Sequence, residues 1–196
     1  MEDVWKNDII RSVEELKDII GEPHEAVVMK MVSQIDSHIE KYIAQSPLFF
    51  LATSATNGRA DVSPRGDQAG FVKVLDHKHI AFIDRPGNRR IDSMVNMLEN
   101  PQVGMIFLIP SLQEVLRING RATLSRNEAL IRDMQWKGKT TGIAVIIEVE
   151  ECFIHCPRAF KQSGIWDVDN WPSKDELPDV MELFRAHLQM NNYKGN

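Results

Sequence analysis

The chain has 196 residues, of which 43% are hydrophobic and 26% charged, and its formal net charge is −5. Such a composition is typical of a globular protein of one domain, and the acidic balance argues against broad binding to nucleic acid or to an anionic membrane surface. The sequence has no apolar run long enough to span a membrane and no leader-like N-terminus, and its two cysteines cannot form a disulfide framework. We therefore expect a cytoplasmic protein with no membrane or nucleic-acid partner.

The first 46 residues have the apolar spacing of amphipathic helices. One helix is expected over residues 7–20, before Gly21, and a longer one after Pro23 that ends near Ser46. Helices of this kind usually pack against a sheet. We interpret residues 1–46 as a helical extension packed on the structure that follows.

From residue 47 the pattern changes to that of short β-strands. Asn57-Gly58 is a strong hairpin signal, and Pro64 predicts that the returning strand ends or bulges there. The run 102–109 is apolar on both faces, which predicts a fully buried strand. The stretches with strand character are 48–56, 59–67, 71–75, 79–84, 102–109, 114–125 and 142–155.

Strands that alternate in polarity and are joined by hairpins indicate an antiparallel barrel, and the helices around them make the fold class α+β. In our interpretation residues 47–165 form this barrel, with short helices at 127–135 and 157–165. Residues 166–196 contain a linker rich in Trp, Pro and Asp, followed by an amphipathic helix over 178–190. We expect all three regions to belong to a single domain.

The most unusual stretch, residues 83–100, predicts a turn and then a helix. Arg85-Pro86-Gly87 makes the turn, and Asn88 after it is a good N-cap because its side-chain oxygen can accept a first-turn amide. The helix that follows has one apolar face, formed by Ile91, Met94, Val95 and Leu98.

Arg89 and Arg90 fall in the first turn of this predicted helix, where cations oppose the helix dipole. An anion held between the two arginines would explain the placement, and phosphate is the commonest such anion. Two solvated arginines paired with Asp84 or Asp92 explain it equally well. The stretch by itself does not separate these two hypotheses.

A second unusual stretch is Ser63-Pro64-Arg65-Gly66-Asp67, which places a hydroxyl, a guanidinium and a glycine at the end of a strand. Taken alone, a surface turn with an Arg65–Asp67 pair is the better interpretation. In a small barrel, however, this strand end can lie beside the start of the helix after residue 88. Three arginines, a serine and an asparagine would then converge on one anion.

The remaining polar residues give no support to a metal site or to nucleophilic catalysis. Cys152 and Cys156 share one face of a strand, which favours buried thiols, and no second Cys/His cluster completes a zinc site. The sequence contains no nucleophile elbow, P-loop, dinucleotide fingerprint or paired-histidine zinc motif. An organic cofactor must therefore supply any difficult chemistry.

Several motifs in a fixed order carry a family resemblance. They are SPRGD at 63–67, FIDRPGNRRIDSMVNMLENPQVGMIFLIP at 82–110, EVLRINGRATLS at 114–125, and His155-Cys-Pro-Arg-Ala-Phe with Ile165-Trp166-Asp167. Over about residues 45–170 the chain resembles the pyridoxamine 5'-phosphate oxidase-like FMN-binding proteins.

The resemblance implies a split β-barrel that forms a homodimer, with FMN in two grooves at the subunit interface. It implies that the strand up to Asp67 lies along the flavin, that Ile83 and Asp84 border the ring system, and that Asn88, Arg89 and Arg90 hold the phosphate. Arg117 or Arg121 is expected to reach the flavin of the second subunit. The residues expected to bind the cofactor are Ser63, Pro64, Arg65, Gly66, Asp67, Ile83, Asp84, Asn88, Arg89, Arg90, Arg117 and Trp166.

The resemblance implies an FMN-dependent oxidoreductase acting on a small molecule, and it names no catalytic residue here. Val115 stands where true pyridoxamine phosphate oxidases carry a glutamine, and their C-terminal Arg/His motif is missing, so we do not expect their substrate. Gln162-Ser163 also replaces the Arg-Ser that is usual in the most similar branch.

Two other functions fit the same barrel. The first is binding of a deazaflavin or haem, and haem would need an axial ligand such as His77, His79 or His155. The second is a protein that holds or senses a flavin without turnover.

Overall fold

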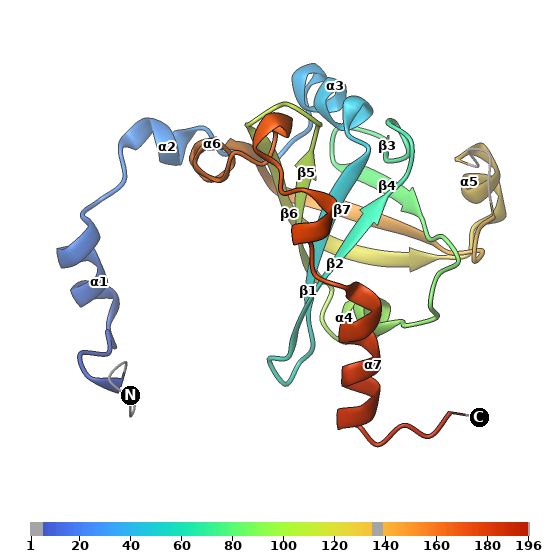
Figure 1. Ribbon diagram of the computed structural model, residues 1–196. Helices are drawn as coiled ribbons and strands as arrows, with labels where there is room; N and C mark the ends of the chain where they lie inside the picture. Colours follow the sequence, from blue (N-terminus) through green and yellow to red (C-terminus); the bar gives the residue numbers. More distant parts are fainter. Residues whose placement is uncertain (1–5, 135–138, 196) are drawn as a thin grey trace. The chain divides into compact units, whose positions relative to one another are not determined.

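The structure is a computed structural model that describes residues 6–134 and 139–195 (Figure 1). The chain divides into two compact units with a boundary between Cys156 and Pro157, and each is described here by itself. The sequence interpretation places the end of the barrel at residue 165. None of the helices in the described ranges combines the length and the hydrophobicity that crossing a bilayer requires.

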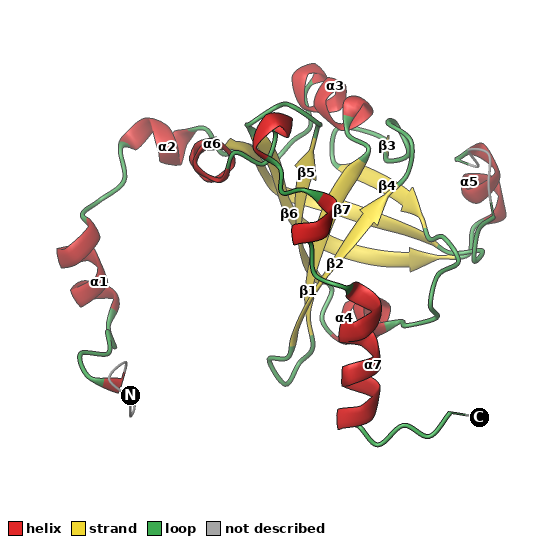
Figure 2. Ribbon diagram, in the orientation of Figure 1, coloured by secondary structure: helices red, strands yellow, loops and turns green. Residues whose placement is uncertain are grey.

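The first unit contains one antiparallel sheet of seven strands in the order β2-β1-β5-β6-β7-β4-β3. Figure 2 shows these strands curving around one another, and β2 and β3 form the two edges of the sheet, so the barrel is not closed. This arrangement confirms the predicted α+β split barrel with flanking helices. The strands are β1 Leu48–Ser54, β2 Ala60–Gly66, β3 Lys73–Val74, β4 His79–Ile83, β5 Gln102–Leu108, β6 Val115–Ser125 and β7 Ala144–His155.

The core lies on the inner face of the sheet. On β6 the predicted alternation is present, since Leu116, Ile118 and Ala122 are buried while Arg121 is exposed. Phe49 on β1 is fully buried, and its ring contacts those of Phe71, Phe82 and Phe107 at centroid distances of 5.6, 5.0 and 5.1 Å.

Seven α-helices lie in the described ranges: α1 Val13–Ile20, α2 Glu25–Met29, α3 Ser37–Gln45, α4 Asp92–Glu99, α5 Glu128–Asp133, α6 Arg158–Ser163 and α7 Val180–Met190. Within the predicted linker of the second unit, Val168–Asn170 and Lys174–Glu176 form short 3-10 helices. The predicted first helix starts late, at Val13, because Ser12 caps it by accepting from the Glu15 amide. The predicted helix over 127–135 ends at Asp133, and residue 135 lies outside the described residues.

The single long helix predicted after Pro23 is wrong. Between α2 and α3 the chain instead forms a bridge with β7, in which Val32 and Cys152 exchange two backbone hydrogen bonds of 3.0 and 2.7 Å. Because β4 begins at His79, opposite Glu148, it does not extend to Cys152, and the bridge supplies backbone partners that β4 does not provide there. Asp36 then caps α3 by accepting from the amides of His38 and Ile39.

Three further predictions differ from the structure. Strand β2 continues through Pro64 in unbroken register, because an edge strand needs no hydrogen bond from that nitrogen on its free side. Strand β5 is buried on one face only, and Gly104 and Ile106 on its other face are half-buried. Cys152 is buried as expected, whereas Cys156 is exposed because β7 ends before it.

Candidate functional site

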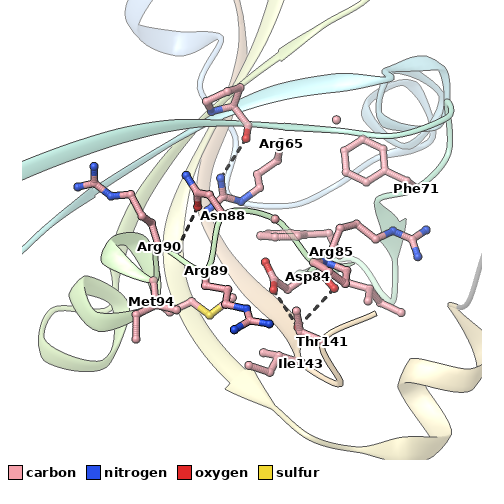
Figure 3. Close-up of a pocket in the computed structure, with 17 residues that line it drawn as sticks. Arg65, Phe71, Asp84, Arg85, Asn88, Arg89, Arg90, Met94, Thr141 and Ile143 are labelled. Atoms are coloured by element: carbon pink, nitrogen blue, oxygen red, sulfur yellow. Dashed lines mark hydrogen bonds between the residues drawn. The ribbon is translucent and has the colours of Figure 1, made fainter. Parts of the chain in front are cut away.

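A pocket of about 600 Å3 opens where the end of β2 meets the loop after β4 (Figure 3). Strand β2 contributes Pro64, Arg65 and Gly66, and the loop contributes every residue from Asp84 to Ile91. The remaining lining residues are Phe71, Phe82, Ile83, Met94, Thr141 and Ile143. Segments that are far apart in the sequence therefore form a single site with both cationic and apolar walls.

The loop after β4 is longer than the sequence predicts. Helix α4 begins at Asp92, so Arg89 and Arg90 lie in the loop that precedes it and not in its first turn. Asn88 is not the N-cap. Its side-chain oxygen instead accepts from the Arg90 amide at 2.9 Å, which closes a turn within the loop. Arg89 has a φ of 64°, a left-handed conformation that is uncommon for a residue with a side chain.

The face of α4 that packs on the sheet is also not the predicted one. Ser93, Asn96 and Met97 are buried, whereas Ile91, Val95 and Leu98 are exposed. Buried polar residues are accepted there because they have partners, and Asn96 donates to Thr53 Oγ1 on β1 at 2.9 Å. Of the predicted apolar face, only Met94 is partly buried against the core.

The N-terminus of α4 borders the pocket through Ile91 and Met94. Ile91 occupies the N-cap position, and no side chain of the described residues accepts a hydrogen bond there. The first amides of a helix have no partner within the helix, and they carry the positive end of its dipole. This end of the pocket therefore favours an anion.

Two of the four arginines that line the pocket are paired with carboxylates. Arg90 Nε donates to Asp92 Oδ2 at 2.9 Å, as one of the two initial hypotheses expects. Arg85 Nε donates to Asp67 Oδ2 at 2.9 Å, and its Nη1 donates to the Lys139 carbonyl. Burial raises the pKa of Asp67, but hydrogen bonds from the Gln68 amide and from Arg85 outweigh this effect and lower the pKa below its usual value.

The other two arginines, Arg65 and Arg89, form no ion pair with the residues that the structure describes. Arg65 donates only to uncharged oxygens, the Pro64 carbonyl at 3.0 Å and Ser93 Oγ at 3.2 Å. The surface pair of Arg65 with Asp67 is thus not formed, because Asp67 pairs with Arg85. In Figure 3 the guanidinium of Arg89 lies towards Thr141 and Ile143, while that of Arg90 points to the opposite side. Two guanidinium groups that form no ion pair with the described residues therefore line one pocket.

The rest of the pocket lining is mostly apolar, and Asp84 is the acidic residue in it. Thr141 Oγ1 donates to Asp84 Oδ2 at 2.8 Å, and the Thr141 amide donates to the Asp84 carbonyl at 3.2 Å. The Asp84 amide donates in turn to the Ile143 carbonyl at 2.9 Å. These bonds fix the orientation of the Asp84 carboxylate beside Phe82 and Ile83.

Eight of the twelve predicted cofactor residues line this pocket: Pro64, Arg65, Gly66, Ile83, Asp84, Asn88, Arg89 and Arg90. Ser63 and Asp67 stand beside it, with the Ser63 hydroxyl donating to Asp61. Arg117 lies on the other face of the sheet, with its guanidinium 5.5 Å from the Phe153 ring centroid. Trp166 belongs to the second unit, where its ring lies 6.1 Å from that of Phe160. The roles assigned to these residues stay predictions.

Sequence reasoning overlooked several residues that form the site. The sequence assigns Arg85 only to a turn, although its position directly after a strand is a usable signal. Phe71 and Met94 look like ordinary core residues in the sequence. Thr141 has no local signal at all, because it reaches Asp84 only through the pairing of β4 with β7.

The model of one protein family, described as pyridoxamine 5'-phosphate oxidase, matches residues 35–156. A search of the curated proteins finds no match. One similar solved structure is HupZ of Group A Streptococcus, which has a TM-score of 0.50 and 18% sequence identity, and the match covers 61% of this chain and 93% of HupZ. A point variant of HupZ has a TM-score of 0.51 and 18% identity, and the match covers 62% of this chain and 99% of the variant. A candidate pyridoxamine 5'-phosphate oxidase of Lactobacillus delbrueckii has a TM-score of 0.48 and 18% identity, and the match covers 62% of this chain and 95% of that one. The HupZ structures support a shared fold.

Proposed function

The chain belongs to the pyridoxamine 5'-phosphate oxidase family, and we propose that it binds FMN in the pocket between β2, β4 and α4 as the cofactor of a small-molecule oxidoreductase. The observation that carries this proposal is the pair of guanidinium groups, Arg65 and Arg89, that line the pocket without a carboxylate partner in the described structure. In a chain with a net charge of −5, such a local excess of positive charge calls for an anion.

The residues present fit the phosphate end of FMN. Charge-assisted hydrogen bonds from Arg65 and Arg89 would neutralise the phosphate, and the uncapped N-terminus of α4 offers amide donors on the same side. Arg90 is paired with Asp92 and contributes mainly through its loop position. Asn88 holds that loop in shape by accepting from the Arg90 amide.

The residues also fit the flat, largely apolar end of a flavin. Phe71, Phe82 and Ile143 line the pocket with little polar surface, and Asp84 stands beside them in an orientation that Thr141 fixes. A pocket of about 600 Å3 lies within the ordinary range for small-molecule sites, roughly 300–1,000 Å3. Bound FMN would supply the electron or hydride transfer, while the chain binds it, orients it and shields it from water.

The histidines bear on the haem alternative. His77, His79 and His155 do not appear among the described residues that line the pocket, and His79 Nδ1 lies 3.0 Å from Asp76. No histidine among the described lining residues could therefore serve as an axial ligand to haem, which favours a flavin. A deazaflavin with a phosphorylated side chain would meet the same arginines, and its absorption spectrum distinguishes it from FMN.

We expect the purified protein to be yellow and to release FMN on denaturation, or to bind added FMN with quenching of the flavin fluorescence. A Soret band would show that the cofactor is haem and not a flavin, and a deazaflavin spectrum would show that it is a deazaflavin. A colourless protein that does not bind added FMN contradicts the proposal. If the FMN-loaded protein is reduced neither by NADH nor by NADPH and is not reoxidised by oxygen, it holds a flavin without turnover.

We also propose that two copies of the chain associate through the outer face of β2, β1 and β5. This face is apolar: Val62 is 65% exposed, Phe50 is 39% exposed, and Ile106 is half-buried. The register places Phe50 beside Ile106 on one side and Pro64 on the other, so these residues form one continuous surface. A continuous apolar surface on a sheet is typical of an interface.

Replacing Val62 with glutamate is expected to convert the dimer into monomers. Two carboxylates would be buried without partners in a symmetric interface, which costs several kcal/mol. Light scattering after gel filtration should give about 45 kDa for the wild type, twice the chain mass of 22.4 kDa, and half that for the variant. Thr56→Glu, at the exposed hairpin tip, adds the same charge outside this face and should remain dimeric. A wild-type monomer, or a Val62→Glu dimer, contradicts this interface.

A further inference from the structure

The side chains of β2 are arranged opposite to those of an ordinary edge strand. Asp61, Ser63 and Arg65 are half-buried and face α4, whereas the small and apolar residues between them are exposed. Of these three polar residues only Arg65 lines the pocket. The residue that meets them from α4 is Ser93, which is 3% exposed. A polar cluster of one buried and three half-buried residues thus stands directly behind one wall of the pocket.

The hydrogen bonds within this cluster have a direction. Ser93 Oγ donates to Asp61 Oδ2 at 2.6 Å, and Ser63 Oγ donates to the same oxygen at 3.0 Å. A hydroxyl has one proton and two lone pairs, so with its proton on the carboxylate Ser93 is left as an acceptor. Arg65 Nη2 donates to the Ser93 hydroxyl oxygen at 3.2 Å. The Asp61 carboxylate is therefore connected to the Arg65 guanidinium through the Ser93 hydroxyl.

We propose that Asp61 and Ser93 are positioning residues, which hold the Arg65 guanidinium in place for the phosphate of the cofactor. This inference rests on the proposed FMN function. A direct ion pair, such as that between Arg85 and Asp67, would compensate the charge of Arg65. Here the Ser93 hydroxyl lies between the two charged groups, so it fixes the Arg65 guanidinium without a direct ion pair to Asp61.

The donor count agrees with this role. A guanidinium has five N–H donors, and Arg65 uses one on Ser93 and one on the Pro64 carbonyl, so that others remain for a ligand. A free arginine side chain loses rotamer entropy when it binds a ligand. Holding it in advance reduces that cost, so the cluster should raise affinity without contacting the ligand.

The test is a double-mutant cycle on the full chain with FMN and riboflavin as probes, followed by flavin fluorescence. Ser93→Ala should raise the Kd for FMN about tenfold, because the Arg65 side chain must then lose its rotamer entropy when FMN binds. In the Arg65→Ala background Ser93→Ala should alter the Kd for FMN by less than about twofold, because the guanidinium that Ser93 positions is absent. Riboflavin, which lacks the phosphate, should bind Ser93→Ala and the wild type alike. Asp61→Ala is expected to follow the same pattern.

Several outcomes overturn the inference. If Ser93→Ala weakens FMN binding equally in the Arg65→Ala background, or weakens riboflavin as much as FMN, Ser93 supports the pocket in general and not Arg65. An unchanged Kd in Ser93→Ala would also refute it. If Ser93→Ala does not fold, as judged by thermal unfolding, Asp61→Ala on the half-buried edge strand decides the question by the same cycle. A wild-type protein that binds riboflavin but not FMN refutes the phosphate role of Arg65 itself, and one that binds neither refutes the proposed function.

Discussion

Replacing Arg65 and Arg89 together with alanine is expected to raise the Kd for FMN by at least about a hundredfold. Each would form a charge-assisted hydrogen bond with the phosphate, and such bonds contribute roughly 1.5–3 kcal/mol each, where 1.4 kcal/mol is a factor of ten. Neither guanidinium forms an ion pair with a carboxylate of the described residues, so the substitution leaves no such carboxylate without its partner. Fluorescence titration with FMN measures the effect directly, and riboflavin should lose much less affinity.

The structure changes which pair of arginines this experiment should target. From the sequence alone the natural choice is Arg89 with Arg90. Arg90 is paired with Asp92, so Arg90→Ala should weaken FMN binding less than Arg65→Ala. The matched control is Arg126→Ala with Arg132→Ala, which removes two exposed positive charges outside this pocket and should leave the Kd unchanged. If the Arg65/Arg89 and Arg126/Arg132 double variants lose equal affinity for FMN, net charge, and not a phosphate site, governs binding.

The strands could be predicted from the sequence because their signals are local. The alternation along residues 114–125 and the turn at Asn57-Gly58 are properties of neighbouring residues, and both appear where the sequence places them. The error at Pro64 arose because the position of a strand within the sheet is not a local property. An edge strand accepts a proline that a central strand would not.

The site was harder to predict because its helix depends on distant partners. Asn88 can cap a helix or close a turn, and the two uses look identical in the sequence. The polar face of α4 is stable because Ser93 and Asn96 find partners on β2 and β1, which no helical periodicity can indicate. Likewise, only the folded chain decides that Asp67 pairs with Arg85 and leaves Arg65 free for a ligand.

The pocket also depends on the core beneath it, and Phe49 is the residue that connects the two. Its ring packs against Phe71 and Phe82, which line the pocket, and against Phe107 in the core. Removing the Phe49 ring therefore leaves a cavity behind the apolar wall that would contact the flavin. Both the free energy of unfolding and the affinity for FMN should fall as a result.

Phe49→Ala is expected to lower the free energy of unfolding by about 3–5 kcal/mol, the usual cost of emptying a fully buried aromatic site. This is a large part of the roughly 5–15 kcal/mol that stabilises an ordinary domain. Urea unfolding at one fixed protein concentration measures it, because association of two chains would make the value depend on concentration. Phe49→Leu keeps most of the volume and should cost less than half as much. If Phe49→Ala costs less than about 1 kcal/mol, within the range of ordinary substitutions, the aromatic cluster does not stabilise the barrel and cannot support the pocket wall.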